Sequence, residues 1–401
     1  MAKKPVVFVA QSHLPLPPLL GGAVQAHFAD ISSRIHGREV LVLSPAHPGL
    51  EREKRVGNLT HLRLQLPAEP IFDAKGRELG TPRVREVRQQ AYLEAVAEVL
   101  EAFDGSIVVG NRPHFASALR SAAPEARLVL SLLNPHVENR EALASYDAII
   151  AISEFVHGEV VAALEVQRLL DDEAAGCREP GHRVDTYVIR GGVDVERFKP
   201  LDPALKNAAR RRLCLPDGPV VLFAGRIVEY KGAHRLLEAF PKVLARLPNA
   251  SLLMVGATAF GSDEPSPYER ALRERAKRLG SVHFAGFVPP SDTPAYWAAA
   301  DVFCGPALWD EPLGLVYQES LASGVPPVGS ARGGIPEVVD HGETGLLLSR
   351  SPSSGEIADA LLTLLCDPNL RDRLARRGRE VAESRFAIED SARATEAVLR
   401  D

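Results

Sequence analysis

Glu311-Pro-Leu-Gly-Leu-Val-Tyr-Gln-Glu319 is the stretch of this sequence that most narrows the fold and the ligand. Its two carboxylates stand eight positions apart, so on a helix they project from nearly the same side. Proline is favoured in a first helical turn, and we therefore expect a short helix that begins beside Pro312. The main-chain N–H groups of Leu313, Gly314 and Leu315 would then be available to an anion. A ligand with hydroxyl groups at both ends and negative charge between them, such as a sugar nucleotide, suits this arrangement; two solvated surface glutamates are the alternative.

Around this stretch, short β-branched apolar runs alternate with segments of helical period, which is the pattern of parallel α/β sheets. The expected strands of the first half are Pro5–Ala10, Glu39–Leu43, Leu59–Leu66, Ser106–Val109, Arg127–Leu133, Ala148–Ile152 and Thr186–Ile189. The pattern restarts with expected strands at Pro219–Ala224, Ser251–Val255, Val282–Ala285, Asp301–Cys304 and Pro326–Val328. Expected helices include Ala23–Ile35, Arg83–Phe103, His114–Ala122 and Gly232–Leu247.

The restart predicts two facing, Rossmann-like, doubly wound parallel-sheet domains with an interdomain cleft, where ligands bind at the carboxyl ends of the strands. We expect a first domain over 1–190, a linker over 191–200, which is rich in turn formers and ends in proline, and a second domain over 201–380. Residues 381–401 form a last amphipathic segment. The polar stretch Val166–Val184 is interpreted as a surface insertion.

Composition excludes several classes of protein. The chain has 401 residues, of which 45% are hydrophobic and 25% charged, the balance of a soluble globular protein of two domains. No apolar run reaches the length of a membrane-spanning helix. The net charge of −5 argues against nucleic acid as a partner. The four cysteines (Cys177, Cys214, Cys304 and Cys366) lack metal-ligand spacing, so we expect free thiols and a cytoplasmic location.

A basic loop after the strand at Pro219–Ala224 is the first candidate for anion binding. Arg226 and Lys231 both lie between this strand and the following helix, beside the predicted cleft. The guanidinium can bind a phosphate in a bidentate manner and the ammonium acts as a point charge, so together they can neutralise a diphosphate.

Three glycine-containing segments could bring backbone close to a ligand. Gly21-Gly22 opens the first helix, Arg332-Gly333-Gly334 precedes another helix start, and Gly286-Phe287 ends a strand where main-chain groups could recognise a nucleobase. Ordinary structural turns are the alternative for the first two, and a buried strand for the third. The dinucleotide fingerprint G-x-G-x-x-G is absent from the first strand–helix turn, which weighs against a dinucleotide oxidoreductase.

Taken in order along residues 219–348, these motifs resemble glycosyltransferase family 4, the retaining transferases of the glycosyltransferase-B type. Gly342-Glu-Thr-Gly345-Leu extends the resemblance toward the C-terminus, and Gly21-Gly22, Ser153-Glu154 and Gly192-Val-Asp194 extend it into the first half. Leu313 stands where the family usually has Phe, and Ser320 where it has Ala. In this family the last helix crosses back to the first domain, so the resemblance implies the same for 381–401.

The resemblance also implies roles for individual residues. Arg226 and Lys231 would hold the donor diphosphate and stabilise the leaving group, Glu319 would bind the ribose hydroxyls, and Glu311 the hydroxyls of the donor sugar. The donor would also be contacted by Gly22, Gly286, Phe287, Gly314, Leu315 and Gly334. A histidine that many members carry near the donor sugar is replaced by Leu133, and His136 is the candidate that could substitute for it. The family needs no metal and no cofactor beyond the nucleotide sugar.

The resulting hypothesis is a retaining hexosyltransferase that uses a nucleoside diphosphate sugar. UDP is the commonest nucleotide in such enzymes, and GDP, ADP and dTDP stay open. The hydroxyl acceptor can be a polysaccharide, a lipid-linked sugar or a small metabolite. A nucleotide-sugar 2-epimerase and a degenerate, non-catalytic nucleotide-sugar-binding protein are the alternatives, and the Glu311–Glu319 pair favours transfer over epimerisation.

Overall fold

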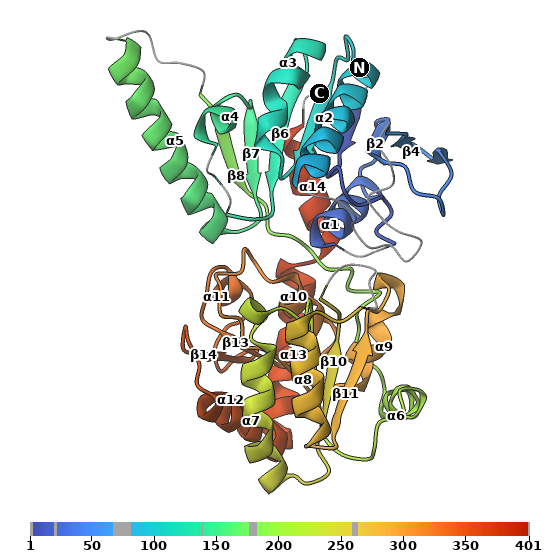
Figure 1. Ribbon diagram of the computed structural model, residues 1–401, viewed down its shortest axis with the longest axis vertical. Helices are drawn as coiled ribbons and strands as arrows, with labels where there is room; N and C mark the ends of the chain where they lie inside the picture. Colours follow the sequence, from blue (N-terminus) through green and yellow to red (C-terminus); the bar gives the residue numbers. More distant parts are fainter. Residues whose placement is uncertain are drawn as a thin grey trace. The chain divides into compact units, whose positions relative to one another are not determined.

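The computed structural model describes residues 3–19, 22–66, 82–135, 137, 139–175, 183–258 and 264–399. The chain divides into two compact units, one formed by Met1–Gly191 together with Ile388–Asp401, and the other by Gly192–Ala387. Each unit contains one sheet covered by helices (Figure 1). The division begins at the expected linker, but residues 192–200 and 381–387 belong to the second unit.

The first unit is built on an eight-stranded sheet in the order β3-β4-β2-β1-β5-β6-β7-β8. Every pairing is parallel except that of β3 with β4. The strands are β1 Val6–Val9, β2 Val40–Pro45, β3 Glu53–Val56, β4 Leu59–Leu64, β5 Ser106–Gly110, β6 Arg127–Leu132, β7 Ala148–Ala151 and β8 Asp185–Val188. Strands β1, β5 and β7 are buried at every residue, as strands covered by helices on both faces must be.

The helices of the first unit include a C-terminal segment that returns to it. They are α1 Ala23–Ser32, α2 Pro82–Val99, α3 Ala116–Ala122, α4 Arg140–Ala144, α5 Glu154–Ala175 and α14 Ile388–Val398, with a short 3₁₀ turn η1 at Pro113–Phe115. Helix α14 packs beside α1 (Figure 1), and Ile388 and Ala392 join the core that contains Phe8 and Phe28. The end of the chain therefore completes the core of the unit in which it began.

The second unit has a wholly parallel six-stranded sheet in the order β11-β10-β9-β12-β13-β14. Its strands are β9 Val220–Ala224, β10 Ser251–Val255, β11 Val282–Gly286, β12 Val302–Gly305, β13 Pro327–Ser330 and β14 Leu346–Leu348. Its helices are α6 Pro203–Arg212, α7 Ala233–Arg246, α8 Pro267–Lys277, α9 Thr293–Ala299, α10 Leu315–Ala322, α11 Ile335–Val338, α12 Ser354–Cys366 and α13 Pro368–Arg385, with 3₁₀ turns η2 Glu229–Lys231 and η3 Pro290–Asp292.

Both sheets reverse their strand order at one point. In the second unit the chain moves outward from β9 to β10 and β11 and then returns to place β12 on the other side of β9. In the first unit β2 lies on one side of β1 and β5 on the other. Loops at the carboxyl ends of two such strands diverge and leave a crevice, which is where open α/β sheets bind ligands. The residues after β9 and β12, and those after β1 and β5, are therefore the first places to look for a site.

The doubly wound α/β architecture is confirmed in both units, and three details of the prediction are wrong. Strands β3 and β14 were not expected. The supposed insertion at Val166–Val184 is helical as far as Ala175, because α5 continues through it, while residues 176–182 lie outside the described part. The helix near Glu311 begins only at Leu315. Gly314 adopts a left-handed conformation with φ of 84°, which prevents the helix from starting at Pro312. None of the helices in the described part of the chain combines the length and apolar character needed to cross a membrane.

Candidate active site

The loop after β9 meets the loop after β12 at the reversal point of the second sheet. Gly232 lies at the junction of η2 and α7 with φ of 75°, and a Cβ there would stand 1.9 Å from the carbonyl oxygen of Pro306. The main-chain N–H of Leu308 donates to the carbonyl of Tyr230 over 2.8 Å. Only glycine allows so close an approach at position 232. Gly232 therefore lets the loop that carries Lys231 pack against the loop that carries Glu311.

An ion pair stands where these loops meet. Lys231 Nζ donates to Glu311 Oε1, and both side chains are largely buried, at 23% and 11% exposed. Trp309 Nε1 donates to the same carboxylate oxygen over 2.8 Å. Among the described residues, Oε2 of Glu311 receives no hydrogen bond. One oxygen therefore holds the carboxylate in place, and the other is left for a ligand.

Aromatic rings surround the ammonium group of Lys231. Its Nζ lies 4.9 Å from the centre of the Trp309 ring and 6.0 Å from that of Tyr230. The two rings meet edge to face at 5.2 Å. Arg226 donates to the Tyr230 hydroxyl and lies 5.6 Å from the centre of the same ring. Tyr230 thus links the two cations that the sequence singles out, and brings Arg226 and Lys231 to one place.

Glu311 lies in the loop before α10, and a third loop supports it. The N–H of Gly334 donates to the Glu311 carbonyl over 2.7 Å. A Cβ on Gly333 would stand 2.1 Å from the same carbonyl oxygen, and one on Gly334 would stand 2.3 Å from that of Pro312. The Gly333–Gly334 turn after β13 therefore packs directly on the Glu311 backbone, which gives Gly334 a supporting role. The Gly334 amide is engaged within the protein.

Helix α10 carries the second glutamate and presents its first turn to the same edge. The N–H groups of Leu313, Gly314 and Leu315 form no hydrogen bond with the described residues. Glu319 lies in the second turn, where its Oε2 accepts a 3.0 Å hydrogen bond from Nε1 of Trp297, a buried residue of α9. The burial of Tyr317, and then the charge of Glu311, raise the pKa of the Tyr317 phenol, which donates to the Gly305 carbonyl over 2.5 Å.

Of the other residues that we expected to contact the donor, Gly286, Phe287 and Gly22 lie in the described part of the chain. Gly286 ends β11 with φ of 73°, its carbonyl accepts from the Gly256 N–H over 2.9 Å, and half-buried Phe287 follows it. In the first unit Gly22 has φ of 102° and its carbonyl begins the hydrogen bonding of α1. Gly21 and His136 lie outside the described residues.

Two residues of the site were missed from the sequence. The chain has two tryptophans, and each donates its indole N–H to one glutamate of the pair, Trp309 to Glu311 and Trp297 to Glu319. The signal for Trp309 was its position two residues before Glu311. The pairing of Trp297 with Glu319 depends on where the fold places α9 relative to Glu319 of α10, which no local pattern reveals.

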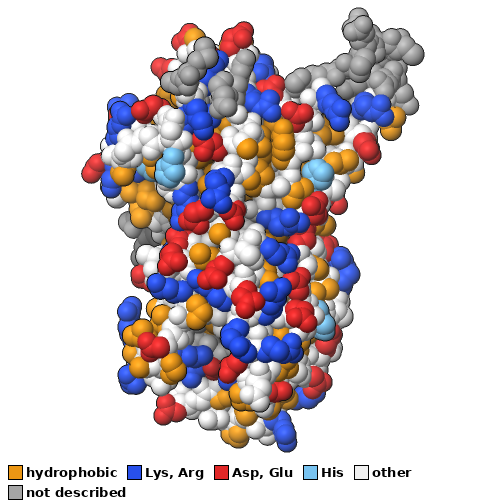
Figure 2. All heavy atoms as spheres, turned by 180° about the vertical axis from the view of Figure 1, so that it is seen from behind, with side chains coloured by type: hydrophobic (Ala, Val, Ile, Leu, Met, Phe, Trp, Pro, Cys, Tyr) orange, Lys and Arg blue, Asp and Glu red, His pale blue; other side chains and the backbone are white. Residues whose placement is uncertain are grey.

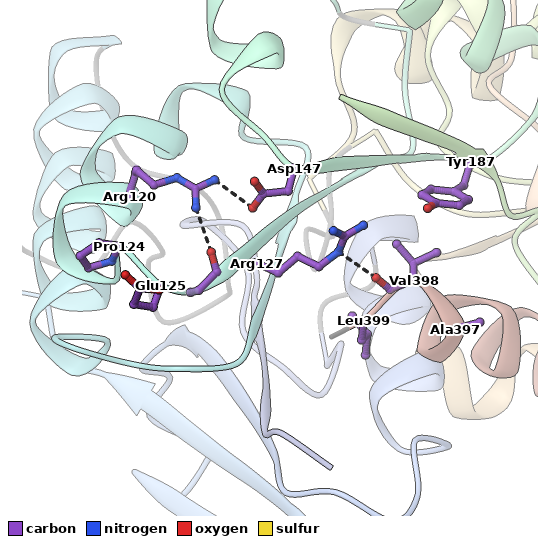
Figure 3. Close-up of a pocket in the computed structure, with 10 residues that line it drawn as sticks. Arg120, Pro124, Glu125, Arg127, Asp147, Tyr187, Ala397, Val398 and Leu399 are labelled. Carbon is purple, nitrogen blue, oxygen red and sulfur yellow. Dashed lines mark hydrogen bonds and ion pairs between the residues drawn. The ribbon is translucent and has the colours of Figure 1, made fainter. Parts of the chain in front are cut away.

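A separate depression of about 540 Å³ lies in the first unit (Figure 3). It is at the amino ends of β6 and β7, the opposite edge from the reversal-point loops. Its two guanidinium groups are satisfied within the protein. Arg120 pairs with Asp147 at 2.9 Å, and Arg127 donates to the Val398 carbonyl at 3.0 Å (Figure 3). Arg127 also pairs with Asp185 at 3.3 Å. We therefore do not count it as the functional site.

On the face that Figure 2 shows, acidic and basic side chains are interspersed without a field of one sign. Within the described ranges, no three His, Cys, Asp or Glu side chains gather in a way that could hold a metal ion.

Several known proteins are similar to this chain. The family model described as "Glycosyl transferases group 1" matches residues 206–381, which contain the whole cluster around Lys231. Spore coat protein SA of Bacillus subtilis is 28% identical over 95% of this chain and 95% of its own length. A GDP-mannose-dependent α-(1-6)-phosphatidylinositol monomannoside mannosyltransferase of Mycobacterium tuberculosis is 36% identical over 47% of this chain and 49% of its own.

Solved structures extend the likeness of fold to the entire chain. Anabaena HepE, in complex with UDP and glucose, superimposes with a TM-score of 0.72 at 23% identity and covers 98% of both chains. The two Rossmann-like units are thus those of the glycosyltransferase-B type, as the sequence predicted. The narrower placement in family 4 stays a prediction. Residues 206–381, somewhat less than half of the chain, match the glycosyl transferases group 1 family, and both units have the fold of the glycosyltransferase-B type.

Proposed function

We propose that the protein is a retaining hexosyltransferase that transfers the sugar of a nucleoside diphosphate sugar to a hydroxyl acceptor. The observation that carries the proposal is the cluster at the β9–β12 reversal point. There two cations and two tryptophan-anchored glutamates stand beside a helix whose first N–H groups have no partner among the described residues. Cations and free N–H groups suit the diphosphate, and the carboxylates suit hydroxyl groups on either side of it.

The Lys231–Glu311 ion pair suggests how donor binding proceeds. Without donor, Glu311 balances the charge of Lys231. When the diphosphate enters, Lys231 turns its remaining protons to the phosphate oxygens, and Glu311 accepts hydrogen bonds from the sugar hydroxyls through Oε2. Arg226, held over Tyr230, supplies the second positive charge. Donor binding thus exchanges partners: Lys231 moves from Glu311 to the phosphate oxygens, and the sugar hydroxyls take its place at the Glu311 carboxylate, whose charge does not change.

The transfer step breaks the bond between the anomeric carbon and the phosphate oxygen. The acceptor oxygen bonds to the same face of the anomeric carbon, and its proton passes to the departing diphosphate. Negative charge grows on the leaving group, so Arg226 and Lys231 act where the transition state needs them most. No metal is required in this scheme, and His136 is the proposed first-unit residue near the donor sugar.

UDP is the proposed nucleotide, and GDP is the second candidate. The HepE complexes hold UDP, and their fold matches this chain throughout. GDP is favoured instead by the mannosyltransferase relative, which is 36% identical over 47% of this chain. Glu319 acts on the ribose in either case, so the base is selected elsewhere, and the residues after β11 are the candidates.

A nuclear magnetic resonance assay of intact donors tests the function. Wild-type protein and the Lys231→Met variant are each incubated with UDP-glucose, UDP-N-acetylglucosamine or GDP-mannose, with and without acceptors. The proposal expects the wild type to release the nucleoside diphosphate and to form a product that keeps the donor's anomeric configuration, while the variant is slow. Unchanged rates in the presence of EDTA are expected for a reaction without metal.

The alternatives give different spectra. A 2-epimerase produces a new nucleotide sugar and no transfer product, and a degenerate binding protein shows donor binding without turnover. A product of inverted configuration contradicts the retaining mechanism, although it leaves the donor site intact.

A further inference from the structure

Arg112 stands at the reversal point of the first sheet, on a backbone fixed from several sides. It follows β5 directly, beyond Asn111, which takes a left-handed φ of 53°. The Asn111 side chain accepts from the Leu133 N–H over 2.7 Å, and the Tyr146 hydroxyl donates to the Arg112 carbonyl over 3.0 Å. The loop after β5 is thereby tied to the end of β6, and the Arg112 side chain starts from a rigid position.

The charge of Arg112 has no carboxylate partner in the described part of the chain. Its Nη1 makes one long contact of 3.4 Å to the carbonyl of Asn111, and its Nε is buried without a hydrogen bond. The nearby Tyr92 phenol supplies no counter-charge, because burial raises its pKa and keeps it protonated, and its hydroxyl donates to the Leu43 carbonyl over 2.9 Å. The nearby His114 imidazole supplies no counter-charge either, since burial and the charge of Arg112 both lower its pKa.

This situation differs from that of other arginines in the same unit. Arg120 pairs with Asp147 at 2.9 Å and Arg127 pairs with Asp185 at 3.3 Å. A half-buried cation without a counter-ion loses part of its hydration, and no ion pair compensates for that cost. Such a cation destabilises the folded state unless an anion binds to it. Because ligands of doubly wound sheets bind at this edge, an anionic group of a ligand is the expected partner of such a cation.

We propose that Arg112 binds an oxyanion, a phosphate or carboxylate, carried by the acceptor substrate. This assignment to the acceptor rests on the proposed function, in which Arg226 and Lys231 of the second unit already bind the donor diphosphate. The acceptor is then an anionic hydroxyl compound. An oxyanion would accept hydrogen bonds from Nη2, which has no partner among the described residues.

The test compares two variants of the full chain, in each of which methionine replaces one arginine: Arg112, which has no carboxylate partner in the described part of the chain, or Arg120, which pairs with Asp147. Met has about the length of Arg without its charge, so Arg112→Met removes an uncompensated cation, and Arg120→Met breaks a paired one. Melting temperatures are measured for both and for wild type in buffer free of oxyanions. The proposal predicts that Arg112→Met melts at or above the wild-type temperature while Arg120→Met melts below it.

Inorganic phosphate is then titrated with UDP present, which occupies the donor site, and again without it. Phosphate should raise the melting temperature of wild type and of Arg120→Met, and its dissociation constant should weaken about tenfold to a hundredfold in Arg112→Met, the equivalent of one charge-assisted hydrogen bond. Glucose, glucose 6-phosphate and glucuronate, used as competitors, separate phosphate from carboxylate recognition.

Two results would overturn the inference. If Arg112→Met lowers the melting temperature as much as Arg120→Met does, the charge is already balanced within the protein. If phosphate stabilises Arg112→Met as it does the wild type, the oxyanion site lies elsewhere. The outcome is distinguishable from failure of the proposed function, since a chain that ignores UDP and every nucleotide sugar can still show the phosphate effect.

Discussion

Replacing Trp309 with Phe tests whether an indole N–H positions Glu311, the glutamate that we propose contacts the donor sugar. The change keeps an aromatic ring beside Lys231 and Tyr230, and it removes the 2.8 Å hydrogen bond to Glu311 Oε1. A hydrogen bond to a charged group contributes about 1.5–3 kcal/mol, and about 1.4 kcal/mol corresponds to a tenfold change in rate. Because Lys231 also donates to this oxygen, the carboxylate keeps one anchor, so we expect the lower end, a fall of about tenfold in kcat/KM.

The assay for this prediction separates the sugar from the nucleotide. Glu311 is proposed to contact the sugar, so Trp309→Phe should weaken binding of the nucleotide sugar and leave UDP binding almost unchanged. Trp297→Phe is the matched control, because its partner Glu319 is proposed to bind the ribose, and UDP itself should then bind more weakly. Each variant keeps one of the two tryptophans, so its fluorescence reports binding. Equal losses for UDP and UDP-sugar in Trp309→Phe, or no loss in kcat/KM, would refute the positioning role.

Three further predictions concern single residues. Glu319→Ala should weaken UDP binding about tenfold through lost ribose hydrogen bonds, and calorimetry with 2′,3′-dideoxy-UDP should show no difference from wild type; a loss with both nucleotides would exclude the ribose role. Gly232→Ala should lower the unfolding free energy by more than about 2 kcal/mol, because its Cβ would lie 1.9 Å from the Pro306 carbonyl oxygen, and equal denaturant midpoints would contradict this. Burial raises the pKa of Asp301, yet Lys206 and Arg210 outweigh it and hold that pKa below its usual value, so the stability it contributes is present above the unfolded pKa and lost as pH falls through the folded one. Asp301→Asn should therefore melt below wild type at pH 7, with a difference that shrinks below about pH 4.

The sheets were predictable because buried strands have a strong local signal. Both faces of a central strand are covered by helices, so its residues are almost all apolar. A short apolar run such as Val220–Ala224 therefore predicts a strand. Strand β3 was missed because all four of its residues are exposed and its charged sequence resembles a loop. The start of α10 was misplaced because Pro312 suits a first turn, whereas the left-handed backbone of Gly314 sets the actual boundary.

The site was predictable only as far as its residue types are distinctive. Arg226, Lys231 and Glu311 stood out in sequence, and the structure brings them together through Tyr230 and Trp309. The tryptophan partners were not foreseen, because they depend on contacts between separate loops and helices. Within the loop after β5, Arg112 was not singled out either, since an arginine without a counter-ion can be recognised only when its neighbours are known.

The most direct test of the account is a thermal-shift titration of wild type and Glu319→Ala with UDP, GDP, ADP, dTDP and NAD. A ligand that binds only the folded state stabilises it by about 2.7 kcal/mol at a hundredfold excess over its dissociation constant. We predict that one nucleoside diphosphate stabilises the wild type and stabilises the variant much less. Stabilisation by NAD alone, or by none of the five, would contradict the claim that the β9–β12 edge binds a sugar nucleotide.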